Sequence, residues 1–484
     1  MIGPRKVRQL GFLDETALAP PTRLRQVLQR IGERVDFGFV RPLAAPHFAA
    51  GGRPSLDPVV VVKMLLLGYL FGISSDRRLV EDCADRLSFR EFLGYGSGEA
   101  LPDHSALTYW RQRLGAEFFR QMLHEVAAQC ARAGMPLSPA RTVDGTRVKA
   151  QADTAGPVRE APAAGTVHDF VAEYFAGDSP AALPPAAVEP PAAVEPPAAE
   201  TVKINDHDPD ARLHARPGEA AEFSYFVSFS ADAVTGIICD ATAGAREEAL
   251  TAAEHVDRDP LGVRELCADK LYDHGVLLSK LQARGVRAYV PARRTARPGY
   301  FSKDDFRYDG VADCYYCPAG QALRLARLTW PEGKRYYLGR VAACGRCALK
   351  ARCTPARART ITRRATEAAR QQAVRAGPRY RYLQARRRHH EHLHALGKRD
   401  HGLRRARSLG LAGMQTQACL TATAINLLKL ARWTPPAAAA AAWGVVGALT
   451  GAVRALHSAL RRRGGRRRPI APRQPRPDRP AYAH

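Results

Sequence analysis

The segment RTVDGTRVKA, residues 141–150, places one carboxylate, Asp144, among β-branched neighbours. An Asp-Gly pair between Thr and Val is a strong short-range signal for a tight hairpin. The alternative is an unbroken strand that carries an acid at the centre of a sheet, which is useful where a divalent metal ion must be held. The residues on either side of the segment decide between these two structures.

The residues before this segment, from 20 to 135, predict helices. Apolar residues recur at helical spacing in LRQVLQRIGERV, PVVVVKMLLLGYLFG and SSDRRLVEDCADRL. Another helix opens at PDHSALTYWRQR, where Asp103 or Ser105 is the expected N-cap. Short helices with exposed arginines suit a helix-turn-helix-like DNA reader, and a helical bundle with a solvated basic face is the alternative. We expect a helical N-terminal domain over residues 1–135.

The residues after the segment change character three times. The repeat PPAAVEPPAAVEPPAAE predicts that residues 151–222 are a Pro/Ala-rich linker insert. The stretch FSYFVSFSADAVTGIICDATA, residues 223–243, predicts a β-hairpin. The stretch GVRELCADKLYDHGVLLSKLQARGVRAYVPARR predicts strand, helix and strand, with the helix over 275–283 and Asp269 directly after the first strand.

Five cysteines cluster in the next stretch, which we expect to form an insert over residues 300–360. CYYCPAG and CGRCALKARC contain two CxxC pairs about 30 residues apart, a spacing typical of tetrahedral zinc sites. Four thiolates complete such a site, and reduced thiols without a metal are the alternative. The expected zinc ligands are Cys317, Cys344, Cys347 and Cys353, with Cys314 as a possible ligand.

The composition indicates a negatively charged partner. The 484 residues include 73 Lys and Arg against 47 Asp and Glu, a formal charge of +26. Such a charge attracts polyanions, nucleic acid first and an acidic membrane surface second, although a GC-rich genome also enriches arginine. A chain of this length predicts about three domains.

The ends of the chain predict neither a secretory signal nor a membrane anchor. MIGPRKVRQLGFLDET lacks an apolar core, and the ten cysteines fit the thiols or metal ligands of a cytoplasmic protein. AAAAAAWGVVGALTGAV, residues 437–453, is rich in Ala and Gly and barely long enough to span a bilayer. It lies in a basic tail, residues 434–484, that we expect to be disordered.

One helical stretch brackets an acid with two cations. In RRRHHEHLHALGK, Arg387 lies four residues before Glu391 and Lys398 seven residues after it, so all three share one helix face. Such cations hold an acid ionised or bind phosphates, and a surface ion-pair ladder is the alternative. Together with Asp144 and Asp269, Glu391 completes a set of carboxylates that can hold two divalent ions.

In this order and spacing, the motifs resemble those of the DDE transposases of bacterial insertion sequences. The similar group has an N-terminal helical domain and a Cys-rich insert before the last acid. GRPSLDPVVVVKMLLLGYLFGISSDRRLVEDC and PDHSALTYWRQR resemble its N-terminal domain, VDGTRVKA and ADKLYD its first two acidic motifs. CPAG with CGRCALKARC resembles its insert, and RRHHEHLHALGK followed by HGLRRAR resembles its third-acid helix. The resemblance runs from about residue 35 to 433.

The resemblance implies an α+β or α/β fold with an RNase H-like catalytic domain over residues 136–433. That domain has a mixed sheet flanked by helices. The resemblance also implies that Asp144, Asp269 and Glu391 ligate Mg²⁺ or Mn²⁺. Arg387 and Lys398 match the family's Arg and Lys around the last acid.

The third motif departs from the family pattern at one position and leaves two other acids open. The family's Tyr, three positions before the Arg, is Gln384 here, and the nearest aromatic residue is Tyr382. Asp273 and Asp400 are alternative members of the acid set.

The function implied is DNA transposition. We expect binding to the terminal inverted repeats of an insertion sequence, metal-dependent cleavage of the phosphodiester, and transfer of the freed 3′-OH to target DNA. The expected partners are DNA and a second copy of the chain, one protomer at each element end, with no membrane partner. The expected location is the bacterial cytoplasm, at the nucleoid. The alternatives are an inactive DNA-binding derivative and a metal-dependent nuclease of the same fold.

Overall fold

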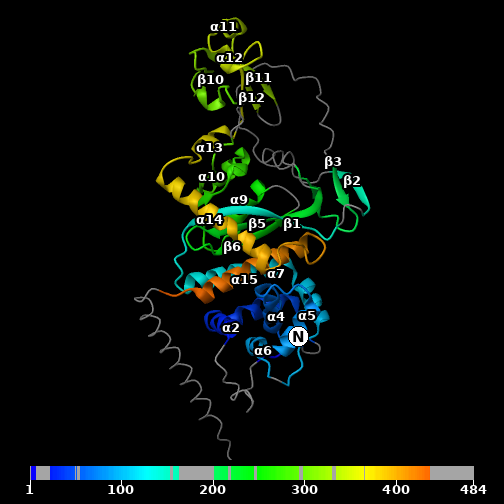
Figure 1. Ribbon diagram of the computed structural model, residues 1–484. Helices are drawn as coiled ribbons and strands as arrows, with labels where there is room; N and C mark the ends of the chain where they lie inside the picture. Colours follow the sequence, from blue (N-terminus) through cyan, green and yellow to red (C-terminus); the bar gives the residue numbers. More distant parts are fainter. Residues whose placement is uncertain are drawn as a thin grey trace, which may run out of the picture. The chain divides into compact units, whose positions relative to one another are not determined.

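The computed structural model describes most of the chain between residues 2 and 435 (Figure 1). The described ranges are 2–6, 22–49, 51, 55–96, 98–152, 156–162, 201–215, 218, 220–244, 248–293, 298–329, 334–364 and 366–435. The chain divides into two compact units, Met1–Arg432 and Trp433–His484. The Pro/Ala repeat, the apolar stretch 437–453 and the basic tail beyond residue 435 lie outside the described residues.

The described N-terminal residues form helices, as the apolar spacing predicts. Asp57 caps α4 and Pro58 occupies its first turn, while Asp103 is the N-cap of α7, with its side chain accepting from Ser105 N. A kink in α7 lies at Gly115, where φ is 74°. The elements are α2 (Arg23–Arg34), η1 (Phe37–Phe39), α3 (Val40–Ala44), η2 (Ala45–His47), α4 (Pro58–Leu70), α5 (Asp76–Asp85), α6 (Leu87–Leu93) and α7 (His104–Arg132).

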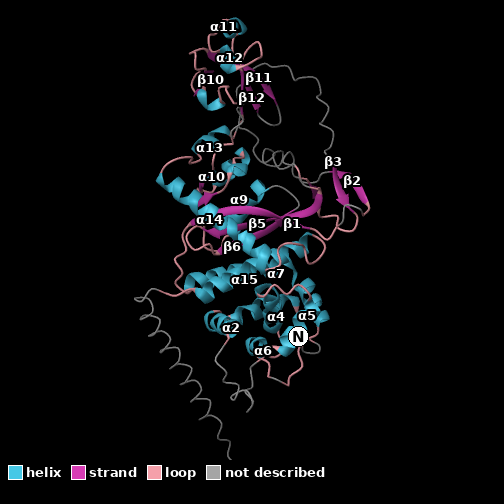
Figure 2. Ribbon diagram, viewed as in Figure 1, coloured by secondary structure: helices cyan, strands magenta, loops and turns pink. Residues whose placement is uncertain are grey.

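A mixed sheet of six strands follows α7 (Figure 2). Its central strand is β1, which is antiparallel to β5 and parallel to β7. Along its other edge, β5 pairs antiparallel with both β4 and β6. On the opposite side of the sheet, β7 pairs parallel with β8. The strands are β1 (Ala140–Lys149), β4 (Arg212–His214), β5 (Glu222–Asp232), β6 (Ile238–Gly244), β7 (Glu265–Cys267) and β8 (Arg287–Tyr289).

The strand β1 runs without a turn through Asp144 and Gly145. Asp144 lies opposite Phe229 and Gly145 opposite Ser228 in an unbroken antiparallel register. Of the two alternatives for this segment, the unbroken strand that carries Asp144 is therefore correct, because cross-strand pairing outweighs the local turn preference of the Asp-Gly pair. The hairpin predicted over 223–243 is formed by β5 and β6.

Helices cover both faces of the sheet. Leu266 of β7 packs in a cluster with residues of α9 and α10, whereas the next residue, Cys267, packs against Leu383 of α14. This alternation follows from the two-residue period of a strand. The β7–α10–β8 unit matches the predicted strand, helix and strand. The helices are α9 (Glu248–Arg258), η3 (Lys270–Tyr272), α10 (Gly275–Ala283), α13 (Glu367–Gln372), α14 (Pro378–Asp400) and α15 (Leu411–Arg432).

The helix α15 connects the end of this region to the N-terminal helices. It is almost entirely buried and packs against α2, α4 and α7 as well as β6. The sequence TQACLTATAINLLKLA fits this position, because apolar and small residues occur all around the helix and no face of it is charged over its length.

The Cys-rich stretch folds around a small core of its own. Five strands form an antiparallel sheet in the order β13-β12-β11-β10-β9. Its core consists of Phe306, Tyr315, Leu323, Tyr337 and Ile361. The elements are η4 (Lys303–Asp305), β9 (Arg307–Asp309), β10 (Cys314–Tyr316), β11 (Ala322–Thr329), β12 (Lys334–Leu338), α11 (Val341–Gly345), α12 (Lys350–Cys353) and β13 (Thr360–Arg363).

The segment expected to be a linker, 151–222, contains strands on both sides of the Pro/Ala repeat. β2 (Val158–Pro162) pairs antiparallel with β3 (Thr201–Asn205), and β4 joins the mixed sheet. TVKIN in β3 alternates apolar and polar residues, a strand signal that is short and easily hidden beside a long repeat. Within the described part of the chain, no helix is both long and apolar enough to cross a membrane.

Candidate active site

The strand register brings Asp144 and Asp269 to the same end of the sheet. The last parallel pair of β1 and β7 is Thr142 opposite Cys267. Two residues further along the chain from each of these lie Asp144, within β1, and Asp269, two residues beyond the end of β7. Asp269 also caps η3, where its Oδ1 accepts from Leu271 N at 2.7 Å.

The helix α14 carries Glu391 and is fixed to β1 by two histidines. His390 Nδ1 lies 2.8 Å from Thr142 Oγ1, and His394 Nε2 donates to the carbonyl oxygen of Asp144 at 3.1 Å. The ring of His394 also stacks on Phe229, with ring centroids 4.7 Å apart. Two of the four histidines of this helix therefore have a structural role.

Electrostatics link the three predicted acids. Burial raises the pKa of Asp144 to about 6, Arg387 opposes this rise, and the charges of Glu391 and Asp269 add to it. Asp144 therefore senses both of the other carboxylates. In this conformation Glu391 is paired with Arg387, whose Nη1 lies 3.1 Å from Glu391 Oε1. Within the described ranges, no three His, Cys, Asp or Glu side chains are grouped closely enough to hold a metal ion.

Gln384 occupies the position of the family's Tyr and connects Arg387 to the sheet. Its Nε2 donates to the carbonyl oxygens of Ala268, at 3.1 Å, and Tyr289, at 3.0 Å. Its Oε1 accepts from Arg387 Nε at 3.3 Å. The side chain thus joins α14 to the ends of β7 and β8, immediately before Asp269.

The second predicted cation, Lys398, lies one turn beyond His394. It is partly buried, and its positive charge adds to burial in lowering the pKa of His394 to about 4, against the hydrogen bond to the Asp144 carbonyl. His394 is consequently neutral at physiological pH, and its hydrogen bond to a carbonyl places the remaining proton on Nε2.

The two alternative acids have other partners. Asp273 is buried between two guanidinium groups, 2.7 Å from Arg370 and 3.1 Å from Arg375. Asp400 is paired with its neighbour Arg399 at 2.8 Å. Both acids therefore act as ion-pair partners in this structure.

A buried polar network lies behind β1 and was not foreseen from the sequence. His255 bridges Asp240, 2.7 Å from its Nδ1, and Ser228, 3.0 Å from its Nε2. Ser228 Oγ donates to the Asp144 carbonyl at 3.4 Å. His124 of α7 reaches the same Asp240 carboxylate at 3.0 Å. The network thus runs from an N-terminal helix to the backbone of the first predicted acid.

Four of the five clustered cysteines lie near one another. The pKa of Cys353 is raised by burial and by the charges of Cys317, Cys344 and Cys347, with Arg359 opposing. Cys314 is buried in β10 and does not contribute to this effect. These are the four thiols expected to be zinc ligands, but among the described residues no three of them are grouped closely enough to hold a metal ion.

Two parts of the chain match protein families. Residues 19–113 match the family described as "Transposase domain (DUF772)", and residues 316–431 match the family described as "Transposase DDE domain". The two matches together support a DDE transposase of insertion-sequence type. The second match contains Glu391, whereas Asp144 and Asp269 precede it. Transposases of this family act on DNA and generally use Mg²⁺ or Mn²⁺.

Comparison with other proteins adds little detail for this transposase. No curated protein matches the chain significantly. Among solved structures, it is similar to "Cryo-EM structure of piggyBac transposase synaptic complex with hairpin DNA". The identity is 10%, the match covers 84% of this chain and 76% of that chain, and the TM-score is 0.28, too low to argue for a shared fold.

Proposed function

We propose that this transposase binds the terminal inverted repeats of its element, cuts a phosphodiester at each end, and joins the freed 3′-OH to target DNA. One observation carries the proposal: Asp269 and Glu391, far from Asp144 in sequence, lie close enough to it at one end of a mixed sheet for their charges to add to the effect of burial on its pKa. We propose an RNase H-like fold for this region, supported by the order of its antiparallel and parallel strands.

The donor set fits Mg²⁺ or Mn²⁺. Three carboxylates offer the hard oxygen ligands these ions prefer. The pKa of Asp144 is raised chiefly by burial and further by the charges of Glu391 and Asp269, and a bound divalent cation would lower it. Held by Asp144, Asp269 and Glu391, such ions supply Lewis acidity to the attacking and leaving oxygens. The protein's own contribution is to keep the acids in place.

Arg387 and Lys398 supply positive charge beside these acids. The Arg387 side chain is only 12% exposed, and its guanidinium reaches Glu391 on one side and Gln384 on the other. A guanidinium in this position can bind the DNA strand, because its paired N–H groups donate charge-assisted hydrogen bonds to two oxygens of one phosphate. We propose that both cations bind the phosphates around the attacked bond.

The other expected components remain proposals. We propose that the four grouped thiols, Cys317, Cys344, Cys347 and Cys353, bind a structural zinc ion, because mutual repulsion of thiolates is relieved by the metal. We propose that the N-terminal helices read the element ends. We also propose a homodimer, one protomer at each end, because two ends must be cut and joined together.

Two observations favour the inactive DNA-binding derivative as the second candidate. Glu391 is engaged by Arg387, and the family's Tyr is replaced by Gln384. A metal-dependent nuclease of the same fold is the third candidate, and the same experiment separates all three.

The test uses supercoiled plasmid carrying the DNA that flanks the gene, incubated with the full chain and Mn²⁺. We expect nicking at the element ends by the wild type, none by Asp144→Asn, and unchanged nicking by Glu254→Gln, which removes an exposed acid of α9. A pre-cut end with a free 3′-OH then tests joining. Equal lack of nicking in wild type and Asp144→Asn supports the inactive derivative, and nicking without joined products supports the nuclease.

A further inference from the structure

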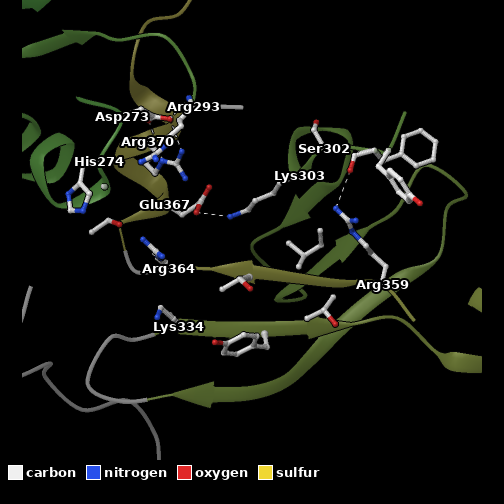
Figure 3. A pocket seen from close by; sticks show the side chains of 18 of the residues that line it. Asp273, His274, Arg293, Ser302, Lys303, Lys334, Arg359, Arg364, Glu367 and Arg370 are labelled. Carbon is white, nitrogen blue, oxygen red and sulfur yellow. Dashed lines mark hydrogen bonds and ion pairs between the residues drawn. The ribbon is translucent and has the colours of Figure 1, made fainter. Parts of the chain in front are cut away.

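A large cavity lies between the Cys-rich sheet and the region that follows Asp269 (Figure 3). Its volume is about 910 Å³. On one side it is lined by Asp273, His274 and Gly275, at the start of α10, and on the other by residues of β12 and β13. None of the residues assigned above to metal or phosphate binding lines it.

The cavity lining is strongly basic. Only two acids take part, and both are already paired: Asp273 with Arg370 at 2.7 Å and Glu367 with Lys303 at 2.6 Å, a contact visible in Figure 3. The six basic residues that line the cavity are Arg293, Lys303, Lys334, Arg359, Arg364 and Arg370. The lining therefore carries an excess of positive charge after its internal pairs are counted.

Two of these cations, Arg293 and Arg364, are exposed. Among the described residues, neither has an ion-pair partner. They belong to different segments, one after β8 and the other after β13, so the chain brings them to one cavity from positions far apart in sequence. A ligand with several separated negative charges can pair with both guanidinium groups at once. A single small anion would need only one of them.

The cavity is close to Asp269, one of the three predicted metal ligands. Asp273, on its rim, follows Asp269 by four residues, which can span at most roughly 14 Å. Because a DNA strand carries a phosphate about every 3.4 Å of its axis, the rim lies within about four nucleotides of a phosphodiester bound at Asp269. Partly exposed aromatic side chains, Tyr300 and Tyr336, offer apolar surface to sugars or bases.

We infer that this cavity binds the sugar–phosphate backbone of the DNA strand adjoining the attacked phosphodiester. The inference rests on the proposed cleavage of DNA at Asp144, Asp269 and Glu391. It adds a second binding site, the cavity, for the part of the DNA strand next to the cut. The Cys-rich sheet thereby acts as one wall of a DNA-binding groove.

The first test compares two double variants in the full chain. Arg293→Ala with Arg364→Ala removes two cavity cations, and Arg340→Ala with Arg346→Ala removes two exposed cations of the same insert that do not line the cavity. Binding to a fluorescent duplex of mixed sequence is measured against NaCl concentration. We expect the slope of log K against log salt to fall by about 1 per lost phosphate contact, about 2 in all, for the cavity variant only.

The second test maps the strand on DNA that flanks the gene. Uncharged methylphosphonates are placed one at a time around the cut. We expect wild type and control variant to lose affinity at positions within about four nucleotides of the cut, and the cavity variant to be insensitive there. Circular dichroism melts verify that both variants fold.

Two results overturn the inference. The first is equal salt slopes for the two variants. The second is that inorganic pyrophosphate at micromolar concentration displaces DNA from the wild type but not from the cavity variant, because this result assigns the cavity to a small anion. Failure of the cleavage proposal is a separate outcome, because it shows as absent nicking by the wild type while the difference in salt slopes persists.

Discussion

Replacing Asp240 by Asn tests whether the buried network behind β1 stabilises the fold. The Asp240 side chain is 0% exposed and lies 3.0 Å from His124 Nε2 and 2.7 Å from His255 Nδ1, with Arg120 at 4.0 Å. Burial acts to raise the pKa of Asp240, but the hydrogen bonds and charges of His124 and His255 outweigh it and lower the pKa. The carboxylate is therefore held ionised in the folded protein.

The expected loss is large because a buried charge loses its partner. Removing one member of a buried pair costs about 3–5 kcal/mol, and we expect the lower end because the amide keeps one acceptor oxygen. At roughly 2–4 °C per kcal/mol, Tm falls by roughly 6–12 °C. The matched control is Glu254→Gln on α9, which breaks an exposed pair with Arg258 and costs at most about 1 kcal/mol.

The lowered pKa of Asp240 determines how its contribution to stability changes with pH. A carboxyl group whose folded pKa is lowered contributes stability that is present above its unfolded pKa, near 3.8, and is lost as pH falls through the folded value. The gap in Tm between wild type and Asp240→Asn should therefore hold from neutral pH to about pH 5 and shrink only at more acidic pH. Melting curves followed by circular dichroism measure it. The reasoning fails if Asp240→Asn melts within the range of Glu254→Gln, or if the gap closes near neutral pH.

Three further predictions concern the candidate active site and the insert. Gln384→Leu leaves two backbone carbonyls without a donor, so we expect the free energy of unfolding to fall by about 1–3 kcal/mol. We also expect nicking to be at least about tenfold slower. A purely structural role of Gln384 predicts instead that the folded fraction nicks at an unchanged rate. His394→Phe keeps the stacking on Phe229 but removes the donor to Asp144, and should destabilise by about 1–2 kcal/mol in chemical denaturation, less than His394→Ala, which also opens a cavity. Metal analysis should find one zinc per chain in the wild type and less in Cys347→Ser, and limited proteolysis should then cut within residues 300–360 first; a zinc-free wild type that resists proteolysis contradicts this.

Local patterns predicted the elements whose signals lie within one stretch of sequence. The helix over 275–283 and the hairpin over 223–243 were predicted correctly, because apolar periodicity and turn residues are local properties. The Asp-Gly pair at Asp144 shows the limit of such reasoning. Its turn preference was overridden by pairing of β1 with β5, a partner more than seventy residues further along the chain.

The contacts that position the candidate active site could not be predicted in this way. His390 and His394 bond to residues 248 and 250 positions away, and the bridge from Asp240 to His124 spans 116 positions. No local period encodes such pairs. The resemblance to a family supplied the acids, but not the side chains that hold them, and at Gln384 the chain departs from the family pattern.

The helix α14 divides its work between two sets of residues, each at four-residue spacing. His390 and His394 bind β1 through Thr142 and the Asp144 backbone. Arg387 and Glu391 form an ion pair with each other. The helix is therefore fixed to the sheet by groups that are neither carboxylates nor proposed metal ligands. Because these bonds do not use the carboxylate oxygens, those of Asp144 and Glu391 are left for charged partners, and in this structure Glu391 pairs with Arg387. Mutation of the histidines should thus alter the spacing of the acids, whereas mutation of Arg387 should alter their charge.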